Sequence, residues 1–141
     1  MKILVTGFHH SGTSILRKII GNHKDIADLW FEVSKNQIVN IKYPEKFVVM
    51  KAPNLNRFIL AACRNLKNLK IISILRDPRD CLVSLEQRYS GRYPFATLKK
   101  DWIECVKNSL EIRSWPYGYL VRYEDLFKNN YEEIKKIFDF I

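Results

Sequence analysis

The chain has 141 residues, a length that fits one domain with a buried core. Hydrophobic residues make up 47% of the sequence, which excludes a disordered chain, and no apolar run approaches the roughly 18–20 residues of a membrane span. The formal charge of +9 favours an anionic partner, such as a nucleotide, a nucleic acid or an acidic substrate. The first residues do not resemble a signal peptide, so we expect a soluble, cytoplasmic protein.

The stretch at residues 3–17 predicts a strand, a glycine loop and a helix in succession. Residues 3–5 are apolar without alternation, which is typical of a strand buried on both faces. Gly7 and Gly12 bracket the loop, and a helical repeat of apolar residues follows, formed by Ile15, Leu16, Ile19 and Ile20. Such an arrangement binds phosphate, because the first amides of a helix lack internal partners and carry the positive end of its dipole.

The spacing from Gly7 to Gly12 is that of a Walker A loop, but the pattern breaks after Gly12. A Walker A loop has Lys at the next position and then Ser or Thr, whereas this chain has Thr13 and Ser14. The loop is therefore predicted to cradle a phosphate without the lysine that reaches the β and γ phosphates. A glycine turn that binds no ligand is the structural alternative.

Three later apolar runs predict further strands of the same kind, at residues 47–50, 71–75 and 119–121. Residues 23–46 give a weaker signal. Within them, residues 28–31 fit either a short strand or a buried loop, and the rest is polar and rich in lysine. We expect loop and a short helix there.

Helical periodicity appears between and after these strands, at residues 55–62, 78–85, 95–113 and 131–141. In the longest of these segments, apolar residues at four-residue steps predict the buried face, namely Leu98, Trp102, Val106 and Leu110. The three cysteines have no metal-ligand spacing, and we expect them to be reduced and packed.

Strands that alternate with helices predict a three-layer α/β fold, with a mostly parallel central sheet of about four to five strands flanked by helices. We expect one domain over residues 1–141. In such sheets ligands bind beyond the carboxyl ends of the strands. The loops that follow the predicted strands should therefore share one crevice, at residues 7–14, 51–57, 76–80 and 122–125.

The loop at residues 76–80 predicts a second anion site. Arg76 ends a strand, and Ser84 lies eight residues later, two turns into the next helix. A planar guanidinium beside a hydroxyl suits a phosphate that needs several donors. An ion pair from Arg76 to Asp80 at the start of the helix is the structural alternative.

Four stretches carry a resemblance to a known family. In chain order they are GFHHSGTSIL, VVMKAP, ISILRDPRDCLVSL and YLVRYEDL. Together they resemble the sulfotransferases that use 3′-phosphoadenosine 5′-phosphosulfate (PAPS), over residues 2 to about 140. The resemblance implies a P-loop-like α/β fold and transfer of a sulfonate group from PAPS to a hydroxyl or amine. The product would be 3′,5′-ADP, and no metal would take part.

The resemblance also implies which residues bind PAPS. The glycine loop would hold the 5′-phosphate, and an Arg and a Ser eight residues apart would hold the 3′-phosphate. These residues are Ser11, Gly12, Thr13 and Ser14 for the 5′-phosphate, and Arg76 and Ser84 for the 3′-phosphate. Residues 123–125 match a signature of one tyrosine and two acids, which we interpret as packing and loop positioning.

Three residues are catalytic candidates by the same resemblance. Lys51 matches the lysine that ends the second core strand, close to the sulfonate in transfer. His10 stands where the family has Lys or Arg, and a nearby phosphate favours its imidazolium, so we expect activity to fall as pH rises through its titration. Glu32, 22 residues beyond His10, matches a general base of some branches, with His9 as its competitor.

Two alternatives stay open. A P-loop nucleotide or nucleoside kinase would need ATP and Mg²⁺, although Thr13 stands at its lysine position. A non-catalytic nucleotide-binding remnant, or a basic nucleic-acid module, would bind without turnover. His10 keeps this reading open, as does a sequence that stops where many family members continue into a basic loop. For the enzyme we expect a small-molecule or glycan acceptor, acidic ones included, and neither membrane nor nucleic acid as a partner.

Overall fold

The computed structural model describes residues 1–54, 57–89, 91–92 and 94–141. The predicted helical residue Leu55 therefore lies outside the described residues. Within the described part, no helix combines the length and apolar character needed to cross a membrane. Among these residues Cys63, Cys81 and Cys105 are buried and form no disulfide, as expected for packed cysteines.

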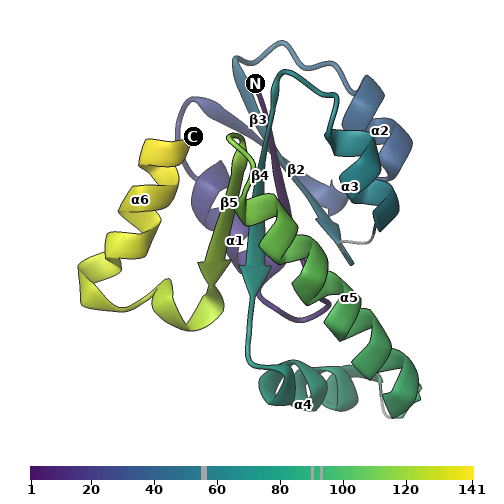
Figure 1. Cartoon of the computed structure of the whole chain (residues 1–141). Coiled ribbons are helices and arrows are strands. Elements are labelled where there is room, and N and C mark those ends of the chain that lie inside the picture. The colour runs from purple at the N-terminus through teal and green to yellow at the C-terminus, as the bar shows by residue number, and fades with distance from the viewer. Residues whose placement is uncertain (55–56, 90, 93) are drawn as a thin grey trace.

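A five-stranded parallel sheet forms the centre of the molecule (Figure 1). Its central strand β1 (Lys2–Gly7) pairs with both neighbours, and residues 3–5 are fully buried. The order across the sheet is β2-β3-β1-β4-β5, and every pairing is parallel. The other strands are β2 (Ile26–Glu32), β3 (Phe47–Pro53), β4 (Leu69–Leu75) and β5 (Gly118–Arg122). The predicted sheet is confirmed, and the undecided residues 28–31 belong to its edge strand β2.

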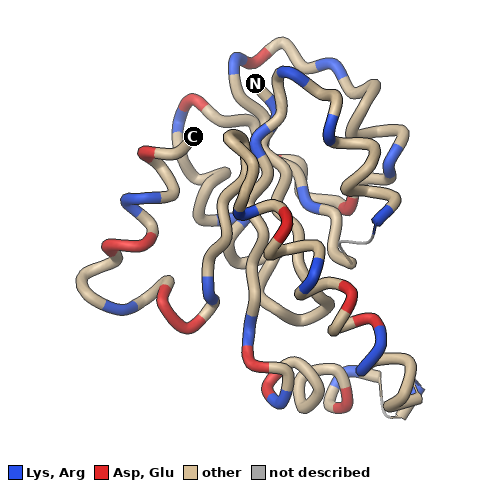
Figure 2. Tube along the Cα trace, in the orientation of Figure 1, with Lys and Arg blue, Asp and Glu red and all other residues tan. Residues whose placement is uncertain are grey.

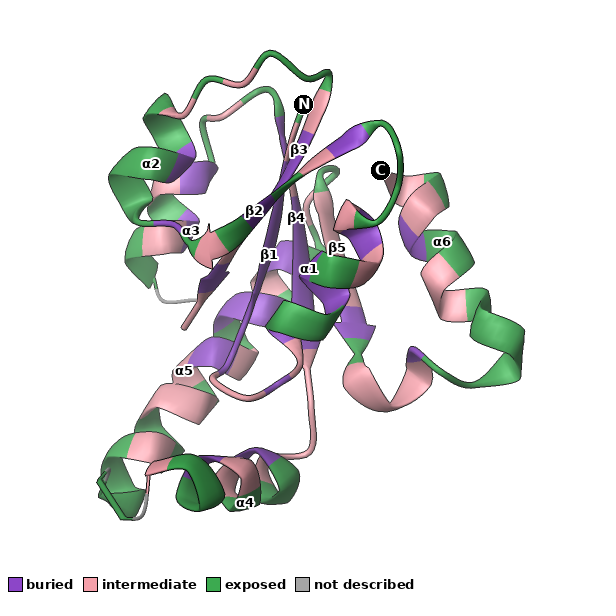
Figure 3. Cartoon of the chain, turned by 180° about the vertical axis from the view of Figure 1, so that it is seen from behind, coloured by how far each residue is buried: buried purple, intermediate pink, exposed green. Residues whose placement is uncertain are grey.

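Helices cover both faces of the sheet, which gives three layers (Figures 1 and 3). One face packs against α1 (Thr13–Gly21) and α6 (Glu132–Phe140), and the other against α2 (Lys35–Asn40), α3 (Arg57–Cys63) and α5 (Phe95–Arg113). Alternate strand residues supply the two cores: Ile3 and Val5 face α1, whereas Leu4 faces the opposite layer. The predicted three-layer fold is confirmed.

The buried face of α5 differs from the predicted one. Leu98 and Trp102 pack against the core, but further along the helix Cys105 and Ile112 are buried and Leu110 is 52% exposed. Steps of four residues drift around a helix that has 3.6 residues per turn, so a stripe that stays on the core must include steps of three. The prediction for the second half of α5 was therefore wrong.

The strand order fixes where a ligand site can lie. The chain places β2 and β3 on one side of β1, and then places β4 and β5 on the other side. The loop after β1 therefore lies between the ends of β3 and β4, at the switch point where open α/β sheets bind ligands. Helix α4 (Pro78–Tyr89) follows β4 and lies at this carboxyl edge, below the sheet in Figure 1.

Candidate functional site

The loop between β1 and α1 is held by its own hydrogen bonds. Ser11 is fully buried, and its amide and hydroxyl both donate to the carbonyl oxygen of Phe8, at 3.2 and 2.7 Å. Gly12 has φ +100°, and no side chain caps the helix there. The first helical residues are the buried Thr13 and the exposed Ser14. Ser11 thus shapes the loop, while α1 presents its first amides without a side-chain acceptor at Gly12.

Two glycines allow this loop to lie close to its neighbours. A Cβ atom on Gly7 would lie 2.4 Å from the carbonyl oxygen of Ile74. A Cβ atom on Gly12 would lie 2.4 Å from Cδ2 of Tyr123, in the short helix Tyr123–Asp125. Real side-chain carbons do not approach other atoms so closely, so both positions require glycine.

Arg76 follows β4 and reaches the same loop. Its Nη1 donates to the carbonyl oxygen of His10 at 3.2 Å, and its Cζ lies 4.5 Å from the ring centroid of Tyr123. The Nε atom is buried and has no hydrogen-bond partner among the described residues. Its distance to a carboxylate oxygen of Asp80 is 3.8 Å, so the predicted helix-start ion pair is present but loose. A buried donor therefore remains unused.

Ser84 lies beside the loop on α4. Its Oγ is 2.8 Å from Nδ1 of His10, although the two residues are 74 positions apart in the sequence. The ring of Tyr89, also on α4, lies edge-on to the His10 ring with centroids 5.8 Å apart. The structure thus brings Arg76, Ser84 and His10 together.

A second group forms around Lys51, near the end of β3. Its Nζ donates to Ser14 Oγ at 2.8 Å and lies 3.1 Å from Oε1 of Glu32, the last residue of β2. The Lys51 side chain is 13% exposed, whereas that of Glu32 is 58% exposed. Lys51 and Glu32 are paired in the strand register, so the sheet itself places both beside the start of α1.

The remaining loops also meet at this edge. The amide of Asn54 donates to the carbonyl oxygen of Gly7 at 2.7 Å, and Glu124 accepts from the amide of Asp77 at 2.8 Å. The four predicted loops therefore share one region, in the described part of each. The amide of Arg57, the last residue of the predicted loop at residues 51–57, donates instead to a carboxylate oxygen of Glu104 in α5.

Both loop histidines favour the neutral imidazole in the free protein. The pKa of His10 lies below its ordinary value, first because of burial and then because of Arg88, His9 and Arg76. Burial also lowers the pKa of His9, and the carboxylates of Glu32 and Asp101 oppose this shift. A neutral His9 near Glu32 can accept a proton, and negative charge brought near His10 would favour its imidazolium.

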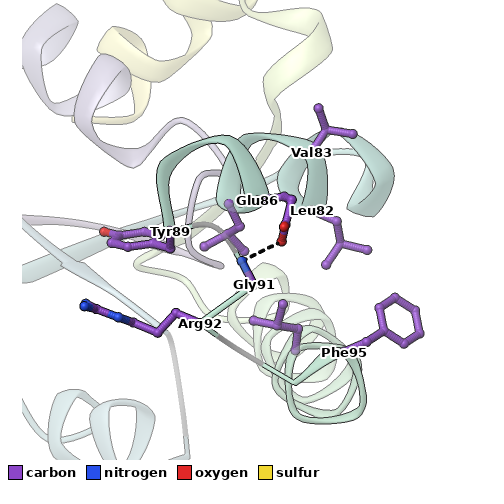
Figure 4. Close-up of a pocket in the computed structure, with 9 residues that line it drawn as sticks. Leu82, Val83, Glu86, Tyr89, Gly91, Arg92 and Phe95 are labelled. Carbon is purple, nitrogen blue, oxygen red and sulfur yellow. Dashed lines mark hydrogen bonds between the residues drawn. The ribbon is translucent and has the colours of Figure 1, made fainter.

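A pocket adjoins this cluster between α4 and α5 (Figure 4). Its walls are mostly apolar, with Glu86, Tyr89 and Arg92 as polar members. Glu86 accepts a hydrogen bond from the amide of Gly91 at 3.1 Å, shown as a dashed line in Figure 4. Because Tyr89 contacts both the pocket and His10, the pocket opens next to the predicted phosphate region.

The parts that Tyr89 and Arg88 play beside His10 were not predicted from the sequence. Tyr89 lies five residues after Ser84, and Arg88 contributes through its charge on His10. The short helical spacing of both residues from Ser84 could have indicated that they lie near it on the helix. That spacing points to the site only once Ser84 is known to face the loop. Within the described chain, no group of three or more His, Cys, Asp or Glu side chains is arranged to hold a metal ion.

Curated relatives are sulfotransferases that match part of the chain. Carbohydrate sulfotransferase 1 of Rattus norvegicus is 32% identical over 95 residues, covering 52% of this chain and 23% of the relative. Sulfotransferase 2A2 of Rattus norvegicus is 34% identical over 88 residues, covering 51% of this chain and 31% of the relative. The matches thus span less than a third of these relatives.

Solved sulfotransferase structures share the fold over almost the whole chain. Mouse sulfotransferase SULT7A1, complexed with PAP, superposes with a TM-score of 0.73 and 21% identity, covering 99% of this chain and 58% of that one. The sulfotransferase domain of the Synechococcus PCC 7002 olefin synthase superposes with a TM-score of 0.77 and 16% identity, covering 99% of this chain and 72% of that one. A family model, the sulfotransferase domain, matches residues 1–141. Since that match runs the full length of a chain with the same fold, the chain belongs to the sulfotransferase domain family.

Proposed function

We propose that this chain transfers a sulfonate group from PAPS to a hydroxyl or amine of an acceptor. The observation that carries the proposal is the presence of two groups of donors at one edge of the sheet. One comprises the start of α1 with Lys51, and the other comprises Arg76 with Ser84. Family membership supports the same activity. A kinase is not favoured, since Thr13 replaces the Walker A lysine.

The residues present fit a nucleotide that carries two phosphates. The uncapped start of α1 at Gly12 suits one phosphate, and the buried Nε of Arg76, which makes no hydrogen bond within the described residues, suits another. In our proposal the amides of Gly12, Thr13 and Ser14 hold the 5′-phosphate, and Ser11 holds the loop in shape. Arg76 and Ser84 hold the 3′-phosphate. PAPS, when bound, supplies the sulfonate on a phosphate leaving group.

Lys51 and His10 provide positive charge where negative charge grows during transfer. The Lys51 ammonium is fixed between Ser14 and Glu32, so it needs little reorganisation to stabilise a developing oxyanion. His10 binds a proton on its ring once phosphate charge is near. Lys51 contacts the start of α1 through Ser14, whereas His10, within the glycine loop, contacts α4 through Ser84.

The acceptor must lose a proton, and Glu32 is our proposed general base. Its carboxylate is mostly exposed and lies beside Lys51. His9 is the competitor, because burial lowers the pKa of its imidazole and so favours the neutral form. We propose that a small-molecule or glycan acceptor approaches through the pocket between α4 and α5, where Arg92 suits an acidic group.

A transfer assay with radiolabelled PAPS and several acceptor classes tests the function. Lys51→Ala should lower kcat about 10²–10³-fold with little change in donor affinity, because it removes a fixed cation used in the transition state. Lys51→Arg keeps the charge and serves as the matched control. Glu32→Gln should lower kcat while His9→Gln should not, if Glu32 is the base.

Three results would contradict this proposal. Binding of PAPS without turnover on any acceptor class would favour the nucleotide-binding remnant. Phosphoryl transfer from ATP with Mg²⁺ would favour the kinase. An unchanged kcat in Lys51→Ala would remove Lys51 from catalysis.

A further inference from the structure

One hydrogen bond connects His10 to Ser84, and the position of its proton decides what Ser84 can offer a ligand. The distance from Nδ1 to Oγ is 2.8 Å. A serine hydroxyl has a single hydrogen to donate. If Nδ1 carries no proton, Ser84 must give its hydrogen to the ring and has none left for a phosphate. If Nδ1 carries a proton, the ring donates and the hydrogen of Ser84 is released.

The surroundings of His10 hold its ring in place and control its charge. The cations Arg88 on α4 and Arg76 after β4 face it, as does His9 in the loop, and together with burial they lower its pKa. Tyr89 packs edge-on against the ring. Arg76 donates to the backbone carbonyl of His10, which has φ +61°. The free protein therefore favours a neutral ring in a fixed position.

We propose that His10 is a positioning residue that makes recognition of the 3′-phosphate depend on a proton, an inference that rests on the proposed function. When Ser84 gives its hydrogen to the arriving 3′-phosphate, its oxygen can only accept a hydrogen bond from the ring, and this favours the protonated ring. One proton moves from solvent to His10, and no covalent bond between heavy atoms changes. Nδ1–H then donates to Ser84 Oγ, and the hydroxyl hydrogen of Ser84 points to the phosphate.

The residue type at position 10 matters for this coupling. A lysine would carry only donors, so it would never compete for the hydrogen of Ser84. An imidazole that carries its one proton on Nε2 accepts a hydrogen bond at Nδ1, whereas the imidazolium donates one there. His10 therefore makes selectivity for a 3′-phosphorylated nucleotide greater at low pH than at high pH.

The test is the ratio of the Kd of AMP to the Kd of adenosine 3′,5′-bisphosphate, measured by calorimetry from about pH 5.5 to about pH 8. The wild-type ratio should fall with rising pH about tenfold more than the ratio of His10→Asn, which corresponds to one charge-assisted hydrogen bond. Asn suits the left-handed backbone at position 10 and does not titrate. Comparing variants cancels the titration of the ligand phosphates themselves.

Ser84→Ala separates positioning from simple charge. This variant keeps the imidazole but removes the hydroxyl. The ratio of its Kd for AMP to its Kd for the bisphosphate should therefore be low, and should change with pH only as much as that of His10→Asn. Circular dichroism checks that each variant folds, and His10→Gln replaces His10→Asn if the latter does not.

Two outcomes overturn the inference while leaving the proposed function intact. If Ser84→Ala keeps the full wild-type dependence on pH, the imidazolium acts directly on the ligand and does not position Ser84. If wild type and His10→Asn show the same dependence, His10 does not control selectivity. Failure of the proposed function gives a different result, in which AMP and the bisphosphate bind equally at every pH, and this would remove the inference as well.

Discussion

At the scale of single residues, Gly12 and Tyr123 show how the loop geometry is set. The ring of Tyr123 occupies the space that a side chain at position 12 would need, and the same ring lies under the guanidinium of Arg76. One aromatic residue therefore contacts both predicted phosphate regions. This explains in physical terms why a tyrosine signature accompanies the glycine loop, without any catalytic part for the ring.

Gly12→Ala should disrupt the site. The new Cβ would lie 2.4 Å from Tyr123 at φ +100°, so strain and overlap together should cost about 1–3 kcal/mol and reduce the affinity for adenosine 3′,5′-bisphosphate. Gly91→Ala is the matched control, since Gly91 also has positive φ (+73°) but its nearest atom would be 3.8 Å away. Thermal unfolding and calorimetry of both variants measure the difference.

The overlap can also be relieved by shortening the side chain at position 123. Adding Tyr123→Ala to Gly12→Ala should recover part of the lost stability. Equal destabilisation by Gly12→Ala and Gly91→Ala, with no recovery in the double variant, would show that the contact with Tyr123 does not matter.

At the scale of elements, α1 and the edge strand β2 are joined by a buried ion pair. Arg17 of α1 pairs with Asp28 of β2, and the Arg17 side chain is only 4% exposed. Gly21 allows this close approach, because a Cβ there would lie 2.7 Å from Asp28 Cβ. Since α1 begins at the glycine loop and β2 ends at Glu32, the pair helps to hold the proposed base near the proposed phosphate site.

Asp28→Ala should therefore destabilise the protein by about 3 kcal/mol, the lower end of the range for breaking a buried ion pair, because Asp28 keeps some access to solvent. Urea denaturation measures this loss as a lower midpoint with an unchanged slope. The double variant Arg17→Met with Asp28→Ala should restore much of the stability, since no buried charge is left unpaired. A midpoint equal to wild type in Asp28→Ala would mean that the pair does not hold α1 to β2.

At the scale of the whole molecule, the parallel sheet collects residues from distant parts of the sequence at one edge. Basic residues are spread over the helices of both layers, as the blue segments of Figure 2 show. Net charge therefore attracts anions to the protein in general, whereas the ends of β1, β3 and β4 determine where one is bound.

The sequence allowed much of this architecture to be predicted, because buried parallel strands leave continuous apolar runs. The runs at residues 3–5, 47–50 and 71–75 fall within β1, β3 and β4. The edge strand β2 was left undecided because its short apolar run adjoins polar residues, and its Trp30 is 79% exposed, whereas the other edge strand β5 was predicted from its run at residues 119–121. The loops that meet at the sheet edge follow from the topology once the strands are parallel.

Side-chain contacts between distant residues could not be predicted in the same way. The contact of His10 with Ser84 joins the glycine loop to α4, and only the packing of α4 below the sheet edge makes it possible. The neutral state favoured by His10 likewise depends on burial and on Arg88, which no local pattern encodes. The pattern of family motifs identified the residues, and the structure supplied their partners.

The central claim is that two sites for negative charge lie one nucleotide apart. Calorimetry with adenosine 3′,5′-bisphosphate, AMP and ATP tests it most directly, in wild type, Arg76→Ala and Arg76→Lys. The account predicts that the bisphosphate binds best, and that Arg76→Ala reduces its advantage over AMP by more than about tenfold, with a smaller loss in Arg76→Lys. Equal affinity of the wild type for AMP and the bisphosphate, or an equal loss for both in Arg76→Ala, would contradict it.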